Sequence, residues 1–360
     1  MCRIILLSIV VSISFLSERI HSLPHTSDNN SSQAYAHTFC HYMKSTPEPR
    51  VLIYNRIPKC GSQSMTNILL QIQHHDSSID QTSRWKQFWW PGDMDTNTTL
   101  VSQFASALKK RLVQNKRVRI TGHWYWHTFD AVHDFGLKRS NDVEYINILR
   151  ECAPRFKSQL LFDLFDTKEA KAAKMNNKLT AHTNSLLYKD ITVRECIEDF
   201  ACLNNVFRKR ILEENHQKLT GMMVEFLSGT KAKQEEGNSS FMGALKHLNK
   251  LHHEDEGYSA LGFLEYYEES LELLECAYPT FFRHALQIYQ QQQTHLHRSS
   301  VSHDPVLYKH PHFEQVLQPL CDVADNPLYQ IALDQFWSKL DFVRKDRKSC
   351  CRSPRPRRPL

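Results

Sequence analysis

Val51-Leu-Ile-Tyr-Asn-Arg-Ile-Pro-Lys-Cys-Gly-Ser-Gln-Ser-Met65 has the pattern of a strand, a short loop and the start of a helix. The apolar run at its beginning is typical of a buried parallel strand. Pro58 and Gly61 then indicate a turn, and apolar residues recur at helical spacing from Ser62 onward. Such an arrangement binds phosphate, because free N–H groups and the positive end of the helix dipole face the anion. The segment therefore predicts an anion site.

Lys59 supplies a positive charge within this loop, and the following helix begins with serine hydroxyls that can donate hydrogen bonds. The loop is not a Walker A loop, because GxxxxGK[ST] is absent and Lys59 precedes the glycine. An ordinary strand-to-helix connection is the alternative interpretation, since short motifs often match by chance. The residues predicted to contact the anion are Lys59, Cys60, Gly61, Ser62, Gln63 and Ser64.

The rest of the chain alternates predicted strands with predicted helices, which indicates an α/β fold with a parallel sheet flanked by helices. Further strands are predicted over 117–121, 144–149 and 261–264, helices over 154–165, 265–277 and 326–344, and polar loops over 75–99, 166–189 and 228–240. Ligands of such sheets bind beyond the carboxyl ends of the strands. Lys59, His123 and Arg150 all lie just past a predicted strand end, so one shared site is expected.

The loop also carries a resemblance to known enzymes. Its order, Arg-x-Pro-Lys-x-x-Ser-x-Ser from Arg56, resembles the 5′-phosphosulfate loop of the sulfotransferases. The fuller string Tyr54-Asn-Arg-x-Pro-Lys resembles the hexuronic acid 2-O-sulfotransferases, which act on heparan sulfate or on chondroitin and dermatan sulfate. The resemblance implies a P-loop-like nucleotide-binding sulfotransferase fold and 3′-phosphoadenosine 5′-phosphosulfate as co-substrate, with no metal. It also implies that Arg56 and Asn67 meet the acidic sugar.

A second nucleotide element is similar to the sulfotransferase pattern Arg-Asp-Pro-x-x-Arg-x-x-Ser. Arg150, Arg155 and Ser158 match this pattern, whereas Glu151 and Cys152 replace its Asp and Pro. The resemblance implies that Arg150 and Ser158 hold the 3′-phosphate, and the guanidinium fork suits a phosphate. Without the proline, a looser turn is expected after Arg150.

Between the two elements, Thr121-Gly-His-Trp124 resembles the Gly-His of the 2-O-sulfotransferases, whose histidine is their proposed base. Thr121 stands where the heparan enzyme carries another histidine. A neutral imidazole with a pKa of about 6.5 can accept a proton from a sugar hydroxyl. The resemblance therefore implies that His123 is the catalytic base, with His127 and His133 as weaker candidates.

The resemblance extends over roughly residues 50–345, although residues 166–250 match poorly. Leu261-Gly-Phe-Leu-Glu265 looks like the strand-helix block of the family. Thr294-His-Leu-His-Arg-Ser299 resembles the lid over the nucleotide, which implies that Arg298 and Ser299 contact it. A homo-oligomer is a further implication of the family.

The N-terminus and the sequons point to the secretory lumen. Residues 4–16 form an apolar block of thirteen residues, shorter than the roughly 20 that span a bilayer. We expect a type II signal anchor, with a cleaved signal peptide as the alternative. Asn-x-Ser/Thr sequons lie at Asn29, Asn30, Asn97 and Asn238. The expected organisation is an anchor over 1–19, a flexible stem over 20–49, one catalytic domain over 50–346 and a disordered basic tail over 347–360.

Charge and cysteines narrow the partners. The net charge of +6 favours a polyanionic partner without identifying one, and the basic tail is read as a solvated end rather than a nucleic-acid site. Ten cysteines in an oxidising lumen allow disulfides, and Cys196 and Cys202 are close enough to bridge locally. No metal site is predicted, because zinc-ligand spacing is absent.

The sequence thus predicts a Golgi-membrane enzyme that sulfates the 2-hydroxyl of a hexuronic acid in a glycosaminoglycan. Two alternatives stay open. One is a lumenal sulfotransferase for another acceptor hydroxyl, and the other is a non-catalytic glycan-binding protein that kept the fold.

Overall fold

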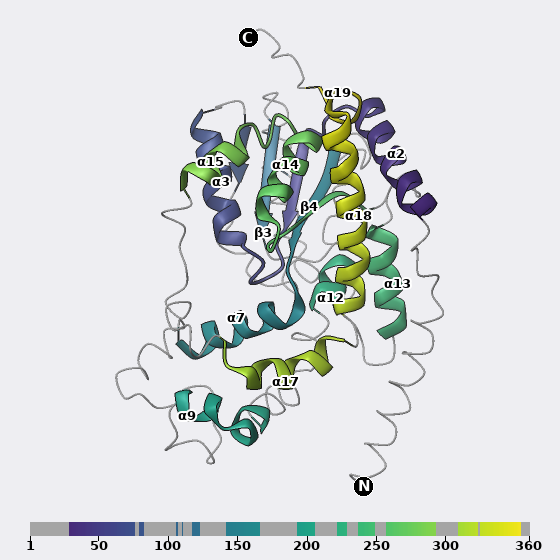
Figure 1. Ribbon diagram of the computed structural model, residues 1–360. Helices are drawn as coiled ribbons and strands as arrows, with labels where there is room; N and C mark the ends of the chain where they lie inside the picture. Colours follow the sequence, from purple (N-terminus) through teal and green to yellow (C-terminus); the bar gives the residue numbers. More distant parts are fainter. Residues whose placement is uncertain are drawn as a thin grey trace.

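A parallel β-sheet lies at the centre of the computed structural model (Figure 1). Its strands are β1 (Val51–Asn55), β2 (Ile79–Thr82), β3 (Arg117–Gly122), β4 (Val143–Leu149) and β5 (Tyr258–Phe263). The strand order is β2-β3-β1-β4-β5, and every neighbouring pair is parallel. The α/β fold with a parallel sheet flanked by helices is therefore confirmed.

The structure describes only part of the chain. These residues are 29–75, 79–82, 106, 110, 117–122, 142–165, 193–205, 222–228, 237–248, 257–292, 309–322 and 325–353. Two further helices that the sequence pattern predicts, over 100–114 and 204–214, lie almost wholly outside the described residues.

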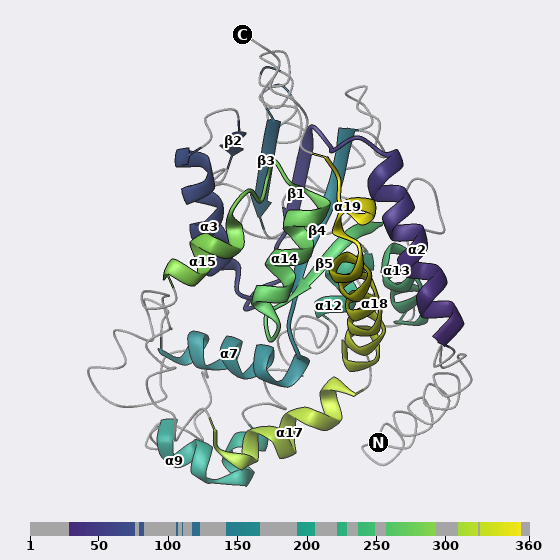
Figure 2. The ribbon, with the colours of Figure 1, turned by 45° about the horizontal axis from the view of Figure 1, so that its top comes forward.

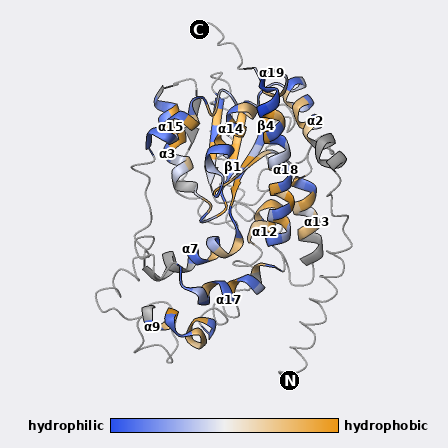
Figure 3. Ribbon diagram, viewed as in Figure 1, coloured by the Kyte–Doolittle hydropathy of each residue, from blue (hydrophilic) through white to orange (hydrophobic). Residues whose placement is uncertain are grey.

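The central strands are mostly hydrophobic, with a few buried polar residues among them (Figure 3). Every residue of β1, β4 and β5 is buried, as expected of parallel strands covered on both faces. The chain crosses from β3 on one side of β1 to β4 on its other side. In sheets of this kind, ligands bind outside the carboxyl ends of the strands where the order reverses. The ends of β1 and β4 are therefore the first place to look for a site.

Helices cover the sheet and extend beyond its carboxyl edge (Figures 1 and 2). One face carries α3 (Ser62–His75), α14 (Tyr267–Ala277) and α15 (Ala285–Gln292). The long helix α18 (Asp325–Lys345) packs on β5 and α14, and it contacts α2 (Asn29–Ser45), α12 (Met222–Ser228) and α13 (Gly237–Leu248). Below the carboxyl edge lie α7 (Cys152–Phe165), α17 (Pro311–Cys321) and α9 (Val193–Glu198).

Both ends of the described chain differ from the sequence expectation. The sequence predicts a flexible stem over 20–49, but α2 lies within this range and packs against α18, with Phe39 and Met43 in the core. The sequence predicts a disordered tail from 347, but α19 (Arg347–Cys350) continues the fold. Two disulfides, Cys40–Cys350 and Cys276–Cys351, join this segment to α2 and α14. These covalent links explain why these polar segments, which contain few strong helix formers, are ordered.

A buried ion pair reinforces the same junction. Arg352 is 4% exposed, and its Nη2 lies 2.6 Å from Oε1 of Glu144 in β4. The guanidinium also lies over the rings of Tyr42 and Tyr278. The folded domain therefore extends from α2 to at least Arg352.

Several segments predicted as loops contain regular structure. The polar stretch 75–99 includes β2, which pairs with β3 at the edge of the sheet. The stretch 228–240 includes the end of α12 and the start of α13. Within the described residues, no helix is both long enough and apolar enough to cross a membrane, and the apolar block 4–16 lies outside them.

Candidate functional site

The loop after β1 has the backbone shape of an anion-binding turn. Lys59 and Gly61 both adopt left-handed conformations, with φ of 64° and 70°. A Cβ at Gly61 would lie 2.5 Å from Cδ1 of Leu264, so only glycine fits there without displacement. Helix α3 starts at Ser62, and the amide of Met65 donates to the carbonyl of Gly61. The first amides of α3 consequently open toward the loop, as an anion site requires.

Arg150 connects this loop to the second predicted nucleotide element. It follows the last residue of β4, and its Nη1 donates to the carbonyl oxygen of Lys59 at 3.0 Å. The side chain is 16% exposed, so the guanidinium is held but remains within reach of solvent. The structure thus brings together, at the carboxyl edge, Lys59 and Arg150, which are two of the three residues that the sequence assigns to one site.

Glu265 is a further charged residue at this edge. It lies two residues beyond β5, and its Oε1 lies 4.0 Å from Nε of Arg150 and accepts from the amide of Glu151 at 3.3 Å. Its Oε2 accepts from the hydroxyl of Tyr329 in α18 at 3.1 Å. Burial raises the pKa of the Glu265 carboxyl, whereas Arg150 and the two hydrogen-bond donors lower it. The carboxylate is therefore fixed on both oxygens beside Arg150.

Of the two predicted sugar-binding residues, Arg56 follows the last residue of β1 and Asn67 lies in α3. The amide of Arg56 donates to the carbonyl of Gly122 at 2.7 Å, and Nη1 of Arg56 donates to the hydroxyl of Thr66 in α3. Burial lowers the pKa of the Arg56 guanidinium. Asn67 is half-buried in the same helix. Arg56 is therefore adjacent to Gly122, the residue that precedes His123, while His123 itself lies outside the described residues.

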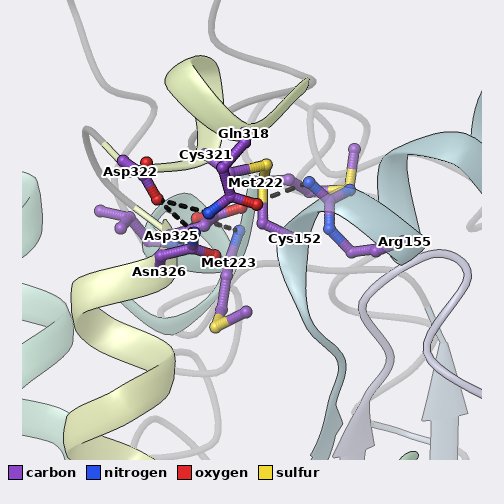
Figure 4. The surroundings of a disulfide bond; sticks show 10 residues. Cys152, Arg155, Met222, Met223, Gln318, Cys321, Asp322, Asp325 and Asn326 are labelled. Carbon is purple, nitrogen blue, oxygen red and sulfur yellow. Dashed lines mark hydrogen bonds and ion pairs between the residues drawn. A yellow bond between two sulfur atoms is a disulfide. The ribbon is translucent and has the colours of Figure 1, made fainter. Parts of the chain in front are cut away.

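Arg155 has a structural position, although it matches the nucleotide motif. Its Nη2 lies 3.2 Å from Oδ2 of Asp325, and both side chains are fully buried (Figure 4). Oδ1 of Asp325 accepts from the amides of Met223 and Val224 at the start of α12. Burial raises the pKa of Asp325 to about 6, although Arg155 and these amides lower it. The pair thus ties α7 to α12 and α18.

A disulfide lies beside this pair and fixes the beginning of α7. Cys152, the first residue of α7, is bonded to Cys321, the last residue of α17 (Figure 4). The sequence predicts a looser turn here because the proline is missing, but a covalent link to α17 holds the turn instead. Ser158, the predicted partner of Arg150, lies half-buried two turns further along α7.

Cys60 lies in the loop between β1 and α3, and it is the free cysteine among the described residues. Its side chain is fully buried, and burial raises the pKa of its thiol to about 12. A thiol with this pKa is protonated at neutral pH and is a poor nucleophile. Cys60 therefore contributes packing and its backbone amide rather than reactivity. The local pair expected from the sequence, Cys196 and Cys202, forms a disulfide.

Some predicted site residues cannot be placed. His123, His127, His133, Arg298, Ser299 and Asn97 lie outside the described residues. The backbones of Ser62 and Gln63 lie in α3, those of Asn29 and Asn30 in α2 and that of Asn238 in α13, but their side chains are not described. Within the described residues, no group of three or more His, Cys, Asp or Glu side chains could hold a metal ion.

Glu265 was not among the predicted site residues, although a signal for it exists. Like Lys59 and Arg150, it is a charged residue that follows a buried strand. Because it follows the carboxyl end of a predicted strand, the same rule that selects Lys59 and Arg150 also selects Glu265. The chain matches none of the protein-family models and none of the curated proteins with which it was compared.

Proposed function

We propose that the chain is a sulfotransferase that moves a sulfuryl group from 3′-phosphoadenosine 5′-phosphosulfate to the 2-hydroxyl of a hexuronic acid in a glycosaminoglycan. The observation that carries this proposal is the hydrogen bond from Nη1 of Arg150 to the carbonyl of Lys59. It joins a loop suited to a 5′-phosphosulfate with a strand-end arginine suited to a 3′-phosphate. One nucleotide carrying anionic groups at both positions accounts for both elements.

The proposed chemistry is an in-line displacement at sulfur. The sulfur–oxygen bond to the 5′-phosphate breaks as a sulfur–oxygen bond to the sugar 2-oxygen forms, and adenosine 3′,5′-bisphosphate leaves. Lys59 would stabilise the negative charge that develops on the leaving phosphate oxygen. His123 would accept the proton of the sugar hydroxyl. No oxidant, reductant or metal is needed to balance this step.

The other site residues bind and orient. Arg150 and Ser158 would hold the 3′-phosphate, and the loop amides with Ser64 would hold the 5′-phosphosulfate. Arg56 joins the ends of β1 and β3 through its backbone amide, and its guanidinium, which donates to Thr66, would pair with a uronate carboxylate. Contacts from Arg298 and Ser299 to the nucleotide, and a homo-oligomer, are parts of the proposal that rest on the family resemblance.

The proposed compartment is the Golgi lumen, with the N-terminus as a type II membrane anchor. Four disulfides in the described residues support an oxidising compartment. The net charge of +6 is compatible with a polyanionic acceptor.

The test is sulfate transfer from labelled donor to a panel of desulfated glycosaminoglycans, followed by disaccharide analysis. We expect label on the 2-position of a uronic acid, and loss of transfer by about a hundredfold or more in His123→Ala, the usual effect of removing a general base. Lys59→Ala should reduce transfer and also lower the affinity for the sulfate donor. Transfer to another hydroxyl would identify a different acceptor. Nucleotide or glycan binding without any transfer would identify a binding protein.

A further inference from the structure

Glu265 occupies a position that calls for an explanation, because a carboxylate beside a phosphate site should repel the phosphate. Its Oε1 lies 4.0 Å from Nε of Arg150, the residue proposed to contact the 3′-phosphate. The Glu265 side chain is 24% exposed, so it is not a core residue kept for packing. A surface acid with no role here would weaken anion binding through like-charge repulsion.

Glu265 contacts both the turn that presents Arg150 and the core of the fold. Its Oε1 accepts from the amide of Glu151, the residue after Arg150, and its Oε2 accepts from Tyr329. Tyr329 is itself 1% exposed, and its ring packs edge-on against Phe263 at the end of β5. The buried Tyr329 therefore holds the Glu265 carboxylate in place, and the carboxylate holds the turn after β4.

Arg150 is consequently held on two sides before any ligand arrives. Nη1 donates to the carbonyl of Lys59 in the phosphate loop, and Nε faces Glu265. A long arginine side chain that must be ordered during binding lowers affinity, and ordering it beforehand removes that cost. Together, these two contacts set the direction of the guanidinium plane.

We propose that Glu265 is a positioning residue that orients Arg150 for the 3′-phosphate and so gives the site its preference for a 3′-phosphorylated nucleotide. This inference rests on the proposed function and extends it. It predicts that Glu265 increases the contribution of the 3′-phosphate to nucleotide affinity and leaves the contribution of the 5′-phosphate unchanged.

The test compares the affinities of the full oxidised protein for adenosine 3′,5′-bisphosphate and adenosine 5′-phosphate, measured by calorimetry. Arg150→Ala should lower the preference for the bisphosphate by between about tenfold and about a hundredfold, as expected for a charge-assisted contact. Glu265→Ala should lower it by about two- to tenfold, which is the ordering cost of one long side chain. Affinity for adenosine 5′-phosphate should stay as in the wild type.

A matched control is Glu272→Ala in α14. Glu272 also pairs with an arginine, Arg344, at 2.8 Å, and its side chain is 19% exposed, but it lies away from the carboxyl edge. This variant should keep the wild-type preference. Glu265→Gln and Tyr329→Phe are the second variants if Glu265→Ala does not fold, because they remove the charge and the supporting hydroxyl with little change of shape.

A double variant separates positioning from an independent effect. If Glu265 acts through Arg150, then Arg150→Ala/Glu265→Ala should lose no more preference than Arg150→Ala alone. Additive losses would overturn the inference, and so would a wild-type preference in folded Glu265→Ala or in both second variants. A wild-type protein with no preference for the bisphosphate would overturn the nucleotide site of the proposed function as well. A preference abolished by Arg150→Ala but untouched at Glu265 would overturn the inference alone.

Discussion

Arg155→Ala should destabilise the protein by about 3–5 kcal/mol, the usual cost of breaking a buried ion pair by removing one partner. Both side chains of the Arg155–Asp325 pair are fully buried, so Asp325 would lose the cation that opposes its burial. Arg344→Ala is the matched control. Its pair with Glu272 is closer, at 2.8 Å, but the arginine side chain is 46% exposed, and such pairs contribute about 0–1 kcal/mol.

The loss of stability in Arg155→Ala should depend on pH, because protonation of Asp325 removes the cost of keeping a negative charge buried. Burial already raises the pKa of Asp325 to about 6 from an ordinary value of 3.8, and removal of Arg155 raises it further. The folded variant therefore keeps the Asp325 proton to a higher pH than the folded wild type does, whereas the unfolded chain has already lost it. A raised carboxyl pKa favours folding below that pKa, and this contribution is lost as pH rises through it. The deficit of the variant should therefore grow from pH 6 to pH 8, by at most about 1.4 kcal/mol per unit.

The measurement is urea unfolding of wild type, Arg155→Ala and Arg344→Ala at pH 6, 7 and 8, with disulfides intact. Calorimetry on the same preparations gives the affinity for adenosine 3′,5′-bisphosphate. Arg155→Ala should lose binding only in proportion to its unfolded fraction. A folded Arg155→Ala with the stability of Arg344→Ala at pH 8, or with a selective loss of nucleotide affinity, would refute the structural assignment of Arg155.

Three further predictions concern the loop, its glycine and the compartment. Cys60 should react with iodoacetamide at pH 8 about a thousandfold more slowly in the native protein than after unfolding, because its thiol pKa rises from 9.0 to about 12 on burial; equal rates in a Cys2→Ser background would contradict this. Gly61→Ala should cost about 1–2 kcal/mol from its φ of 70° alone, with an added clash against Leu264, whereas Gly243→Ala within α13 should be neutral or stabilising in the same melts. Glycosidase treatment should increase the gel mobility of the cell-made protein through glycans at one or more of the sequons at Asn29, Asn30, Asn97 and Asn238, and unchanged mobility would count against lumenal exposure.

The central strands could be predicted closely because their signal is local. The apolar run 51–54 at the start of the quoted segment and the strands predicted over 117–121 and 144–149 each differ by a single residue from β1, β3 and β4. Strand β5 begins at Tyr258, three residues before the predicted start. Tyr258 and Ser259 look polar in sequence, but the Tyr258 hydroxyl accepts from Asn55 and the Ser259 carbonyl accepts from Lys339. These partners are distant in the chain, so local pattern could not reveal them.

The missed helices depend on tertiary contacts in the same way. Helix α2 has a polar sequence, yet it is ordered against α18 and bonded to α19 through Cys40. Helix α17 contains Pro319 and is joined to α7 through Cys321. Helix propensity is a weak guide where a disulfide and packing stabilise the segment. Cysteine spacing alone could not assign these pairings.

The two residues that depart from the sulfotransferase pattern are the ones that carry new contacts. Glu151 replaces an aspartate, and its backbone amide donates to Glu265. Cys152 replaces a proline, and it is bonded to Cys321. A proline stiffens a turn by fixing φ, whereas a disulfide stiffens it by tying it to another element. The turn after Arg150 therefore has a different source of rigidity, and the absence of the proline is no argument against a nucleotide site at this end of β4.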